Sequence, residues 1–192
     1  MEQKMQWSEN VILIDADFLD SLVQDFIINF ERMINRPLGK LDLCHWLDCL
    51  LLDVGLKEGE HDNFVAFLHK KENKGLKFVN PGDFKEFLSG KAFKDRLGEF
   101  SLGSFPIEDI VSRGEFMSDA LKAAMESDKT QHVLVIADTN AYGSRICNAA
   151  NGETKAEVTF FSMEHLSPGK YKQQILGYSV MSGLGIRSDE LK

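Results

Sequence analysis

The sequence contains few cysteines, no excess of basic residues and no long hydrophobic run. Its three cysteines, Cys44, Cys49 and Cys147, show no regular spacing, which excludes a disulfide-rich scaffold and favours reduced thiols in the cytoplasm. Cys44, His45 and Cys49 also lack the spacing of a tetrahedral metal site, so we interpret them as packing or surface residues. The first ten residues are polar, and no run of about 20 apolar residues follows. We therefore expect neither a signal peptide nor a membrane span.

Positive charge is also scarce. The formal net charge is -8 over 192 residues, which argues against a general affinity for nucleic acids, because that affinity depends on Lys and Arg side chains that meet phosphates. Two local basic runs stand out, namely Lys70, Lys71, Lys74 and Lys77, and then Lys91, Lys94 and Arg96. We interpret each run as solvated surface charge.

Short apolar runs alternate with helical segments along the chain. Runs typical of buried strands occupy residues 11–14, 63–69, 132–137 and 157–161. Helical segments occupy residues 19–34, 43–54, 116–125 and 141–150. This alternation predicts βαβ units, and we find no internal repeat or linker. We therefore expect a single α/β domain over residues 1–192, Rossmann-like in type, with three layers and a central, mostly parallel sheet.

Other segments have weaker patterns. Residues 75–79 are predicted to form a short strand and residues 83–88 a short helix. Residues 91–109 are interpreted as an irregular connection whose aromatic residues complete the core, with a lid or binding loop as the alternative. Ser167 and Pro168 indicate the start of a helix that extends through Tyr178, or else residues 174–181 form a strand.

Two of the predicted strands end in polar residues that can bind a ligand. The first leads to Asp15 and Asp17, and the run at 132–137 leads to Asp138 and Asn140. In an open parallel sheet, ligands bind outside the carboxyl ends of the strands, so these side chains meet at one mouth if the two strands are neighbours. The alternative is that they cap the following helices or form turns, and either Asp17 or Asp20 is the expected cap of the first helix.

Carboxylates in that position can hold a hard divalent cation. Mg²⁺ prefers oxygen ligands and keeps several waters, so a few Asp side chains suffice. Such an ion, Mg²⁺ or Mn²⁺, activates a water and stabilises the leaving oxygen of a phosphodiester. We predict Asp15 and Asp138 as the catalytic metal ligands, and Asp17 and Asn140 as groups that support them or position water.

These segments resemble the PIN-like superfamily of metal-dependent ribonucleases, in particular its NYN branch. The apolar run before Asp15 resembles the first strand of that family and its acid. In residues 116–125, Asp119 resembles the acid at the start of the helix before the fourth strand. The run before Asp138 resembles the later strand that ends in Asp-x-Asp, and residues 156–161 resemble the last strand. The resemblance covers most of the chain.

The resemblance implies an α/β fold, single-stranded RNA as the substrate, and a Mg²⁺ or Mn²⁺ ion held by Asp15, Asp119 and Asp138. Asn140 stands where the family usually has a second Asp, and Ala137 where it often has Gly. These departures leave open a folded relative with weak or no catalysis. On its helix, Asp119 lies away from the centre of the apolar stripe, which fits either a residue facing a cleft or an ordinary surface acid.

Two other functions are open alternatives. Asp15, Asp17 and Asp138 resemble the acids of haloacid-dehalogenase-like phosphohydrolases, but Phe18 and Leu19 replace that family's Gly and Thr, which ranks this reading lower. A non-enzymatic α/β module that binds a protein partner is the third reading, and the acidic net charge favours it. A basic surface beside the acids would favour the nuclease, whereas an apolar patch there would favour the protein partner.

Overall fold

The strand β1 (Asn10–Asp15) lies at the centre of the sheet, and every one of its residues is buried. The computed structural model describes residues 4–192. In it, β1 pairs in parallel with β3 (Asp62–Lys70) on one side and with β7 (His132–Ile136) on the other. The strands that precede Asp15 and Asp138 are therefore neighbours, which is the condition that the sequence left open.

The main sheet contains seven strands in the order β5-β6-β3-β1-β7-β8-β9. Its other strands are β5 (Lys91–Asp95), β6 (Gly98–Ile107), β8 (Glu157–Ser162) and β9 (Lys172–Ile175). All neighbouring pairs are parallel except β5 and β6. Without β5, the strand order is that of the doubly wound Rossmann fold. In that fold successive strands are added on one side of the first strand and then, from the fourth strand on, on its other side. The first and fourth strands are here β1 and β7. The prediction of a mostly parallel sheet is confirmed.

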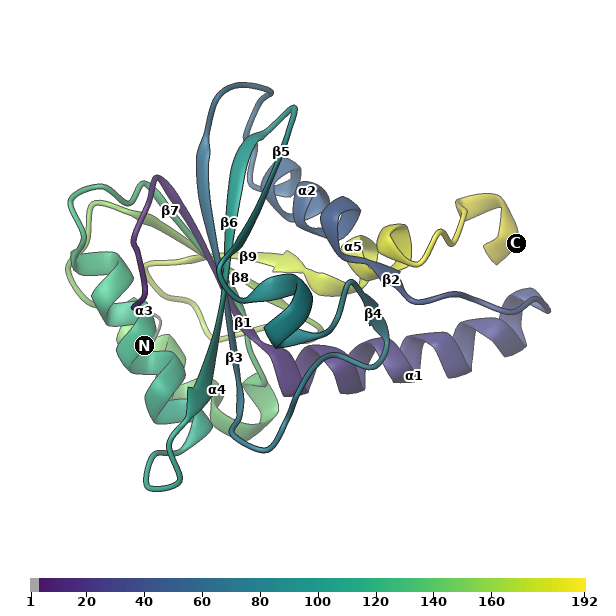
Figure 1. Cartoon of the computed structure of the whole chain (residues 1–192), viewed down its shortest axis with the longest axis horizontal. Helices are drawn as coiled ribbons and strands as arrows, with labels where there is room; N and C mark the ends of the chain where they lie inside the picture. Colours follow the sequence, from purple (N-terminus) through teal and green to yellow (C-terminus); the bar gives the residue numbers. More distant parts are fainter. Residues whose placement is uncertain (1–3) are drawn as a thin grey trace.

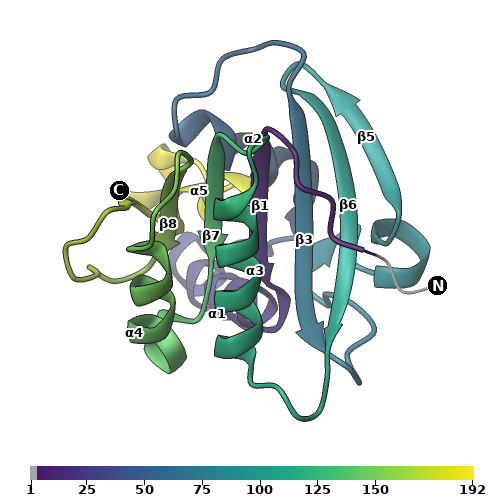
Figure 2. The same cartoon turned by 90° about the vertical axis from the view of Figure 1, so that its left-hand side faces the viewer.

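Helices cover both faces of this sheet (Figure 1). They are α1 (Ala16–Ile34), α2 (Leu43–Asp53), α3 (Arg113–Glu126), α4 (Thr139–Ala150) and α5 (Leu176–Gly183). Along β1, Ile12 and Ile14 pack with α1, α2 and α5, whereas Val11 and Leu13 pack with α3 and α4. Figure 2 looks onto the face that α3 and α4 cover. The alternation produces the predicted three layers.

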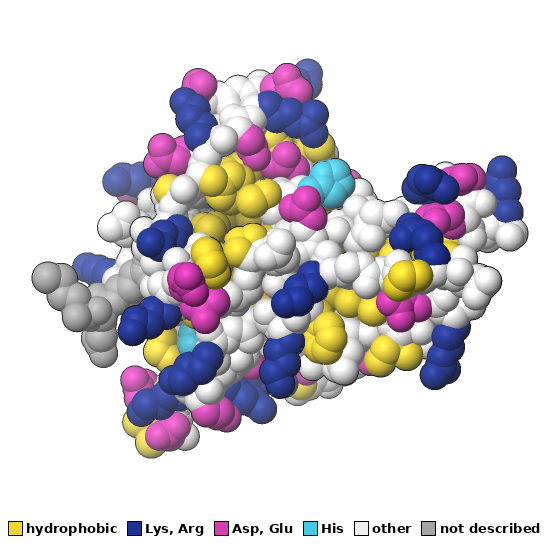
Figure 3. All heavy atoms as spheres, turned by 45° about the vertical axis from the view of Figure 1, so that its right-hand side comes forward, with side chains coloured by type: hydrophobic (Ala, Val, Ile, Leu, Met, Phe, Trp, Pro, Cys, Tyr) yellow, Lys and Arg dark blue, Asp and Glu magenta, His cyan; other side chains and the backbone are white. Residues whose placement is uncertain are grey.

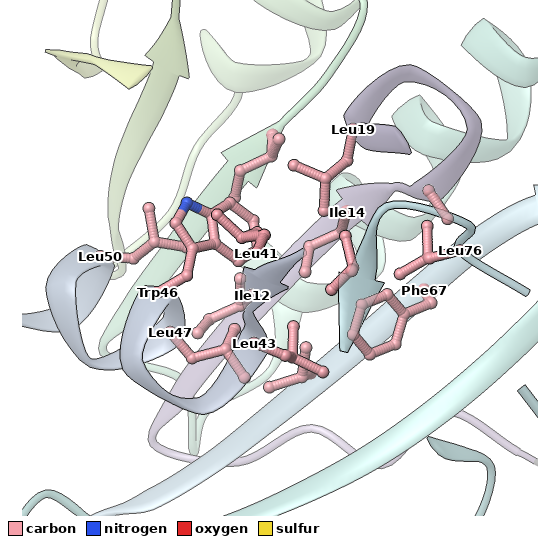
Figure 4. Close-up of a cluster of buried hydrophobic side chains, with 14 of the residues drawn as sticks. Ile12, Ile14, Leu19, Leu41, Leu43, Trp46, Leu47, Leu50, Phe67 and Leu76 are labelled. Carbon is pink, nitrogen blue, oxygen red and sulfur yellow. The ribbon is translucent and has the colours of Figure 1, made fainter. Parts of the chain in front are cut away.

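The layer of α1, α2 and α5 contains the larger buried cluster, part of which is drawn in Figure 4. The side chains of Trp46 and Leu50 of α2 lie in the same cluster as Leu41 in this view. Leu41 belongs to β2 (Leu41–Asp42), which pairs with β4 (Val79–Asn80) in a separate two-stranded sheet. Trp46 is fully buried and its ring N–H donates to the hydroxyl of Ser179 at 3.1 Å. The tryptophan thus ties α2 to α5.

Two local predictions were wrong. Residues 91–109 are not an irregular connection, because most of them form the antiparallel hairpin of β5 and β6. Their aromatic residues do complete the core, since Phe100 and Phe105 are buried. The cap of α1 is Asp15, and not Asp17 or Asp20, because the helix begins directly after β1.

The segment after Pro168 also differs from its prediction. Residues 172–175 form the edge strand β9 and the helix starts only at Leu176, because pairing with β8 outweighs the helical start signal. The strand predicted at 75–79 is reduced to β4, and the short helix at 83–88 is a π-helical turn, η1 (Phe84–Leu88). A short 3₁₀ turn, η2 (Ser188–Leu191), follows α5. Within residues 4–192, no helix has both the length and the apolar character required to cross a membrane.

Candidate functional site

Asp15 is the most buried of the predicted site residues, with 2% of its side chain exposed. As the N-cap of α1, it accepts the N–H of Phe18 on Oδ1 at 3.1 Å. Its other oxygen, Oδ2, accepts the hydroxyl of Tyr142 at 2.6 Å and a guanidinium N–H of Arg113 at 3.0 Å. One carboxylate therefore connects β1 with α1, α3 and α4.

Arg113 joins the two predicted catalytic acids. Its Nη1 donates to Asp15, and its Nη2 donates to Oδ2 of Asp138 at 3.1 Å. Arg113 is the first residue of α3, directly after the N-cap Ser112, where the helix dipole disfavours a cation. The two carboxylates compensate for that position, and the guanidinium also lies over the ring of Tyr142, 5.8 Å from its centroid.

Burial dominates the electrostatics of this cluster. It raises the pKa of Asp15 above the ordinary value, and the hydrogen bond from Tyr142 and the charge of Arg113 act in the opposite direction. Burial and the charge of Asp15 also raise the pKa of Tyr142, which stays protonated and serves as a donor. Asp138 accepts the N–H of Ala141 on Oδ1 at 3.1 Å. All four carboxylate oxygens of the two acids thus accept a hydrogen bond.

This donor set does not fit a hard divalent cation. Mg²⁺ requires oxygen ligands that are free to face it, together with bound waters. Here a guanidinium lies between Asp15 and Asp138 and supplies one positive charge at the position where a divalent ion would bring two. In the described part of the chain, no three His, Cys, Asp or Glu side chains are grouped so that they could hold a metal. Coordination would require Arg113 to leave both acids.

Two other predicted residues lie apart from this pair. Asp119 is exposed and lies six residues after Arg113 on α3, about 9 Å further along the helix axis. Asn140 is exposed in the first turn of α4. The structure therefore brings Asp15 and Asp138 together, and it does not join Asp119 or Asn140 to them.

Asp17 faces a loop and not the acid pair. Its two carboxylate oxygens accept the backbone N–H of Lys70 at 2.8 Å and the side-chain amide of Asn73 at 2.7 Å. Asp20, one turn further along α1, accepts the N–H of Phe78 at 2.8 Å. The two acids of α1 thus hold the loop that follows β3.

Arg113 and Tyr142 were not predicted from the sequence, although both contact Asp15 directly. One signal was available, since Ser112 and Glu115 form a capping box that places a basic residue in the first helical turn, against the usual preference. Gly114, in the first turn of the same helix, is a second signal. A side chain there would place its Cβ 2.8 Å from the Cβ of Tyr142, so glycine permits the close approach of α3 and α4.

Comparison with known proteins adds one finding. The model of a family of unknown function, DUF6621, matches residues 4–191. The chain belongs to this family. No curated protein and no solved structure matches it. The family match spans the whole sheet and all five predicted site residues, while its description states no activity.

A second polar cluster in this family member lies where α2 meets α5. Nε2 of His45 lies 2.9 Å from the hydroxyl oxygen of Ser182, and Sγ of Cys49 lies 3.7 Å from the same nitrogen. The cluster connects two packed helices, which agrees with the interpretation of His45 and Cys49 as packing or surface residues.

A pair of carboxylates lies between α2 and the end of β5. Burial raises the pKa of Asp48 to about 7, and the hydrogen bond and charge of Asp95 act in the same direction. Arg96, whose Nε lies 4.0 Å from Oδ2 of Asp48, counteracts them only in part. Because this pKa is higher in the folded than in the unfolded state, the contribution of Asp48 to stability is complete at low pH and is lost as the pH rises through about 7.

We expect Asp48→Asn to stabilise the protein by about 1 kcal/mol at pH 8 and to have a much smaller effect at pH 5. The amide cannot ionise, so the variant avoids the cost of a buried negative charge at high pH. Urea unfolding at the two pH values measures the difference. Asp128→Asn, at an exposed position, is the matched control and should change neither value. An equal gain at both pH values would contradict the expected ionisation of Asp48.

Proposed function

We propose that this chain is a catalytically degenerate relative of the PIN-like, NYN-type ribonucleases, and that it acts by binding and not by metal-dependent hydrolysis. The observation that carries the proposal is the guanidinium of Arg113, which donates to both Asp15 and Asp138. A hydrolase of this type needs a divalent cation and an activated water at that point. An arginine supplies charge and hydrogen bonds there, but it cannot activate water as a metal ion does.

The fold supports the same proposal. The two acids lie at the carboxyl ends of β1 and β7, between which the strand order reverses, and this is where doubly wound proteins bind their ligands. Asn140, in the place of a second Asp, fits the loss of a metal ligand. We infer that the two acids are retained because they now stabilise the packing of α3 and α4 against the sheet.

A calorimetric titration of Mn²⁺, combined with a cleavage assay on single-stranded RNA, tests this proposal. We expect the wild-type protein to show no Mn²⁺ binding that depends on Asp15 and no cleavage of the RNA. Arg113→Ala frees two carboxylates, so this variant should bind Mn²⁺ weakly, and Asp15→Asn added to it should abolish that binding. Mn²⁺ binding by the wild-type protein that disappears in Asp15→Asn, accompanied by RNA cleavage, would contradict the proposal and favour an active nuclease.

A further inference from the structure

A cavity of about 960 Å³ lies beside the carboxyl ends of β3 and β6. Its lining includes His69 of β3 and Pro106 of β6, which are register partners, together with residues of η1. The size is at the upper end of the range for sites that take small organic ligands. The residues that line it and carry the argument below are His69, Lys71, Lys74, Phe84, Lys85 and Lys91.

The lining is positively charged in a chain whose net charge is -8. Four lysines line the cavity, against the two acids Asp83 and Glu86, and the carboxylate of Asp83 already accepts the N–H of Glu86 at 2.7 Å. Among the residues that the structure describes, only one of these lysines, Lys71, has an ion pair within 4.0 Å, with Glu108 and Asp109 at 3.8 Å. On the face drawn in Figure 3, dark-blue Lys and Arg side chains at the lower left are interspersed with magenta Asp and Glu side chains.

His69 and Phe84 form an apolar and aromatic wall within this basic cavity. Their rings stack, with centroids 4.1 Å apart, and both are buried. Nδ1 of His69 lies 2.8 Å from the carbonyl oxygen of Lys70, which can only accept, so this nitrogen carries the proton. Burial lowers the pKa of His69, so the ring is neutral at pH 7 and its Nε2 is an acceptor. The wall thus suits a planar group that bears a hydrogen-bond donor.

The loop that carries Lys71 and Lys74 is held in place by the rest of the fold. Asp17 binds its first part through Lys70 and Asn73, as described above. At its far end, a Cβ on Gly82 would lie 2.1 Å from the carbonyl oxygen of Leu76, so the backbone is packed closely there. A site whose walls are already ordered binds its ligand at a lower entropic cost.

We propose that this cavity binds a nucleotide, with the lysines on its phosphates and Nε2 of His69 accepting a hydrogen bond from its base. Lys is a common phosphate ligand, acting as a point charge, and a neutral imidazole nitrogen can accept the amino N–H of a base such as adenine. The cavity lies on the face of the sheet that α1, α2 and α5 cover, because Phe84 belongs to their cluster. Arg113 and Tyr142 contact Asp15 from α3 and α4 on the other face. The proposal therefore does not rest on the proposed function.

Calorimetric titrations of ATP, adenosine and inorganic tripolyphosphate into the wild-type protein test the nucleotide site. We expect ATP to bind, tripolyphosphate to bind more weakly because it lacks the base, and adenosine to bind more weakly because it lacks the phosphates. The double variant Lys74→Glu/Lys85→Glu should weaken ATP binding by at least about tenfold, since each substitution replaces a phosphate contact with repulsion. Lys122→Glu/Lys129→Glu, at exposed positions outside the cavity, has the same change in net charge and should alter the affinity less than about twofold.

A variant that is expected to bind ATP more tightly completes the test, because misfolding cannot increase the affinity. Glu86→Gln removes one acid from the lining and should tighten ATP binding by about threefold. The absence of ATP binding by the wild-type protein, or equal binding by the cavity variant and its control, would overturn the proposal. So would a short single-stranded RNA that displaces ATP at a lower concentration than ATP itself requires, because the site would then be part of an RNA surface. The Mn²⁺ and cleavage measurements probe the opposite face, so either proposal can fail alone.

Discussion

Replacing Trp46 with Ala is expected to lower the free energy of unfolding by about 4 kcal/mol. The ring is fully buried between α2, α5 and β2, so its removal leaves a large cavity among residues that belong to three elements. It also leaves the hydroxyl of Ser179 without the indole N–H that donates to it. Urea or guanidinium unfolding, followed by circular dichroism, measures the loss.

Two further variants separate the cavity from other effects of this substitution. Trp46→Phe keeps most of the apolar volume and should cost only about 1 to 2 kcal/mol. Tyr178→Ala removes an aromatic ring from α5 at a position that is 66% exposed, and it should change the stability by no more than about 0.5 kcal/mol. A loss in Trp46→Ala that is no greater than that in Tyr178→Ala would contradict the described packing of α2 on α5.

Arg113→Ala is expected to destabilise the protein by about 3 kcal/mol at pH 8. The substitution leaves Asp15, of which 2% is exposed, charged and without its cation. The pKa of Asp15 is already raised by burial and rises further when Arg113 is absent. When the pKa of a carboxyl is higher in the folded state, the cost of its buried charge grows as the pH rises above the pKa of the unfolded state. The stability lost in Arg113→Ala should therefore be smaller at pH 5 than at pH 8. Denaturant unfolding at both pH values measures it.

Arg145→Ala is the matched control for this experiment. Arg145 lies in α4, is 55% exposed in its side chain and forms a surface ion pair with Glu115 at 3.7 Å. Its removal should cost no more than about 0.5 kcal/mol and should show little dependence on pH. If Arg113→Ala behaves like this control at both pH values, Arg113 does not compensate the charges of Asp15 and Asp138, and the basis of the proposed function is lost.

The order of the main elements could be read from the sequence because the signals are local. The apolar runs before Asp15 and Asp138 are long enough to be strands and too apolar to be exposed, so both were expected inside a parallel sheet, where β1 and β7 lie. The amphipathic spacing of residues 19–34 is also a local signal, and it predicted α1.

Edge elements were harder to predict, because their residues contact solvent and carry a weak apolar pattern. In β9, residues 172–175 are not buried, and their strand conformation depends on pairing with β8. The hairpin of β5 and β6 depends likewise on β3, beside which β6 lies in parallel. Long-range pairing of this kind leaves little trace in a local window of sequence.

The sequence by itself determined the α/β class, the parallel sheet and the position of two acids at the ends of β1 and β7. Only the tertiary structure decided what these acids face. Arg113 is 98 residues away from Asp15 along the chain and 25 away from Asp138, and packing of α3 and α4 on the sheet brings it between them. A carboxylate at the end of a strand has the same local signal whether a metal ion or an arginine compensates its charge, because the compensating group comes from elsewhere in the fold.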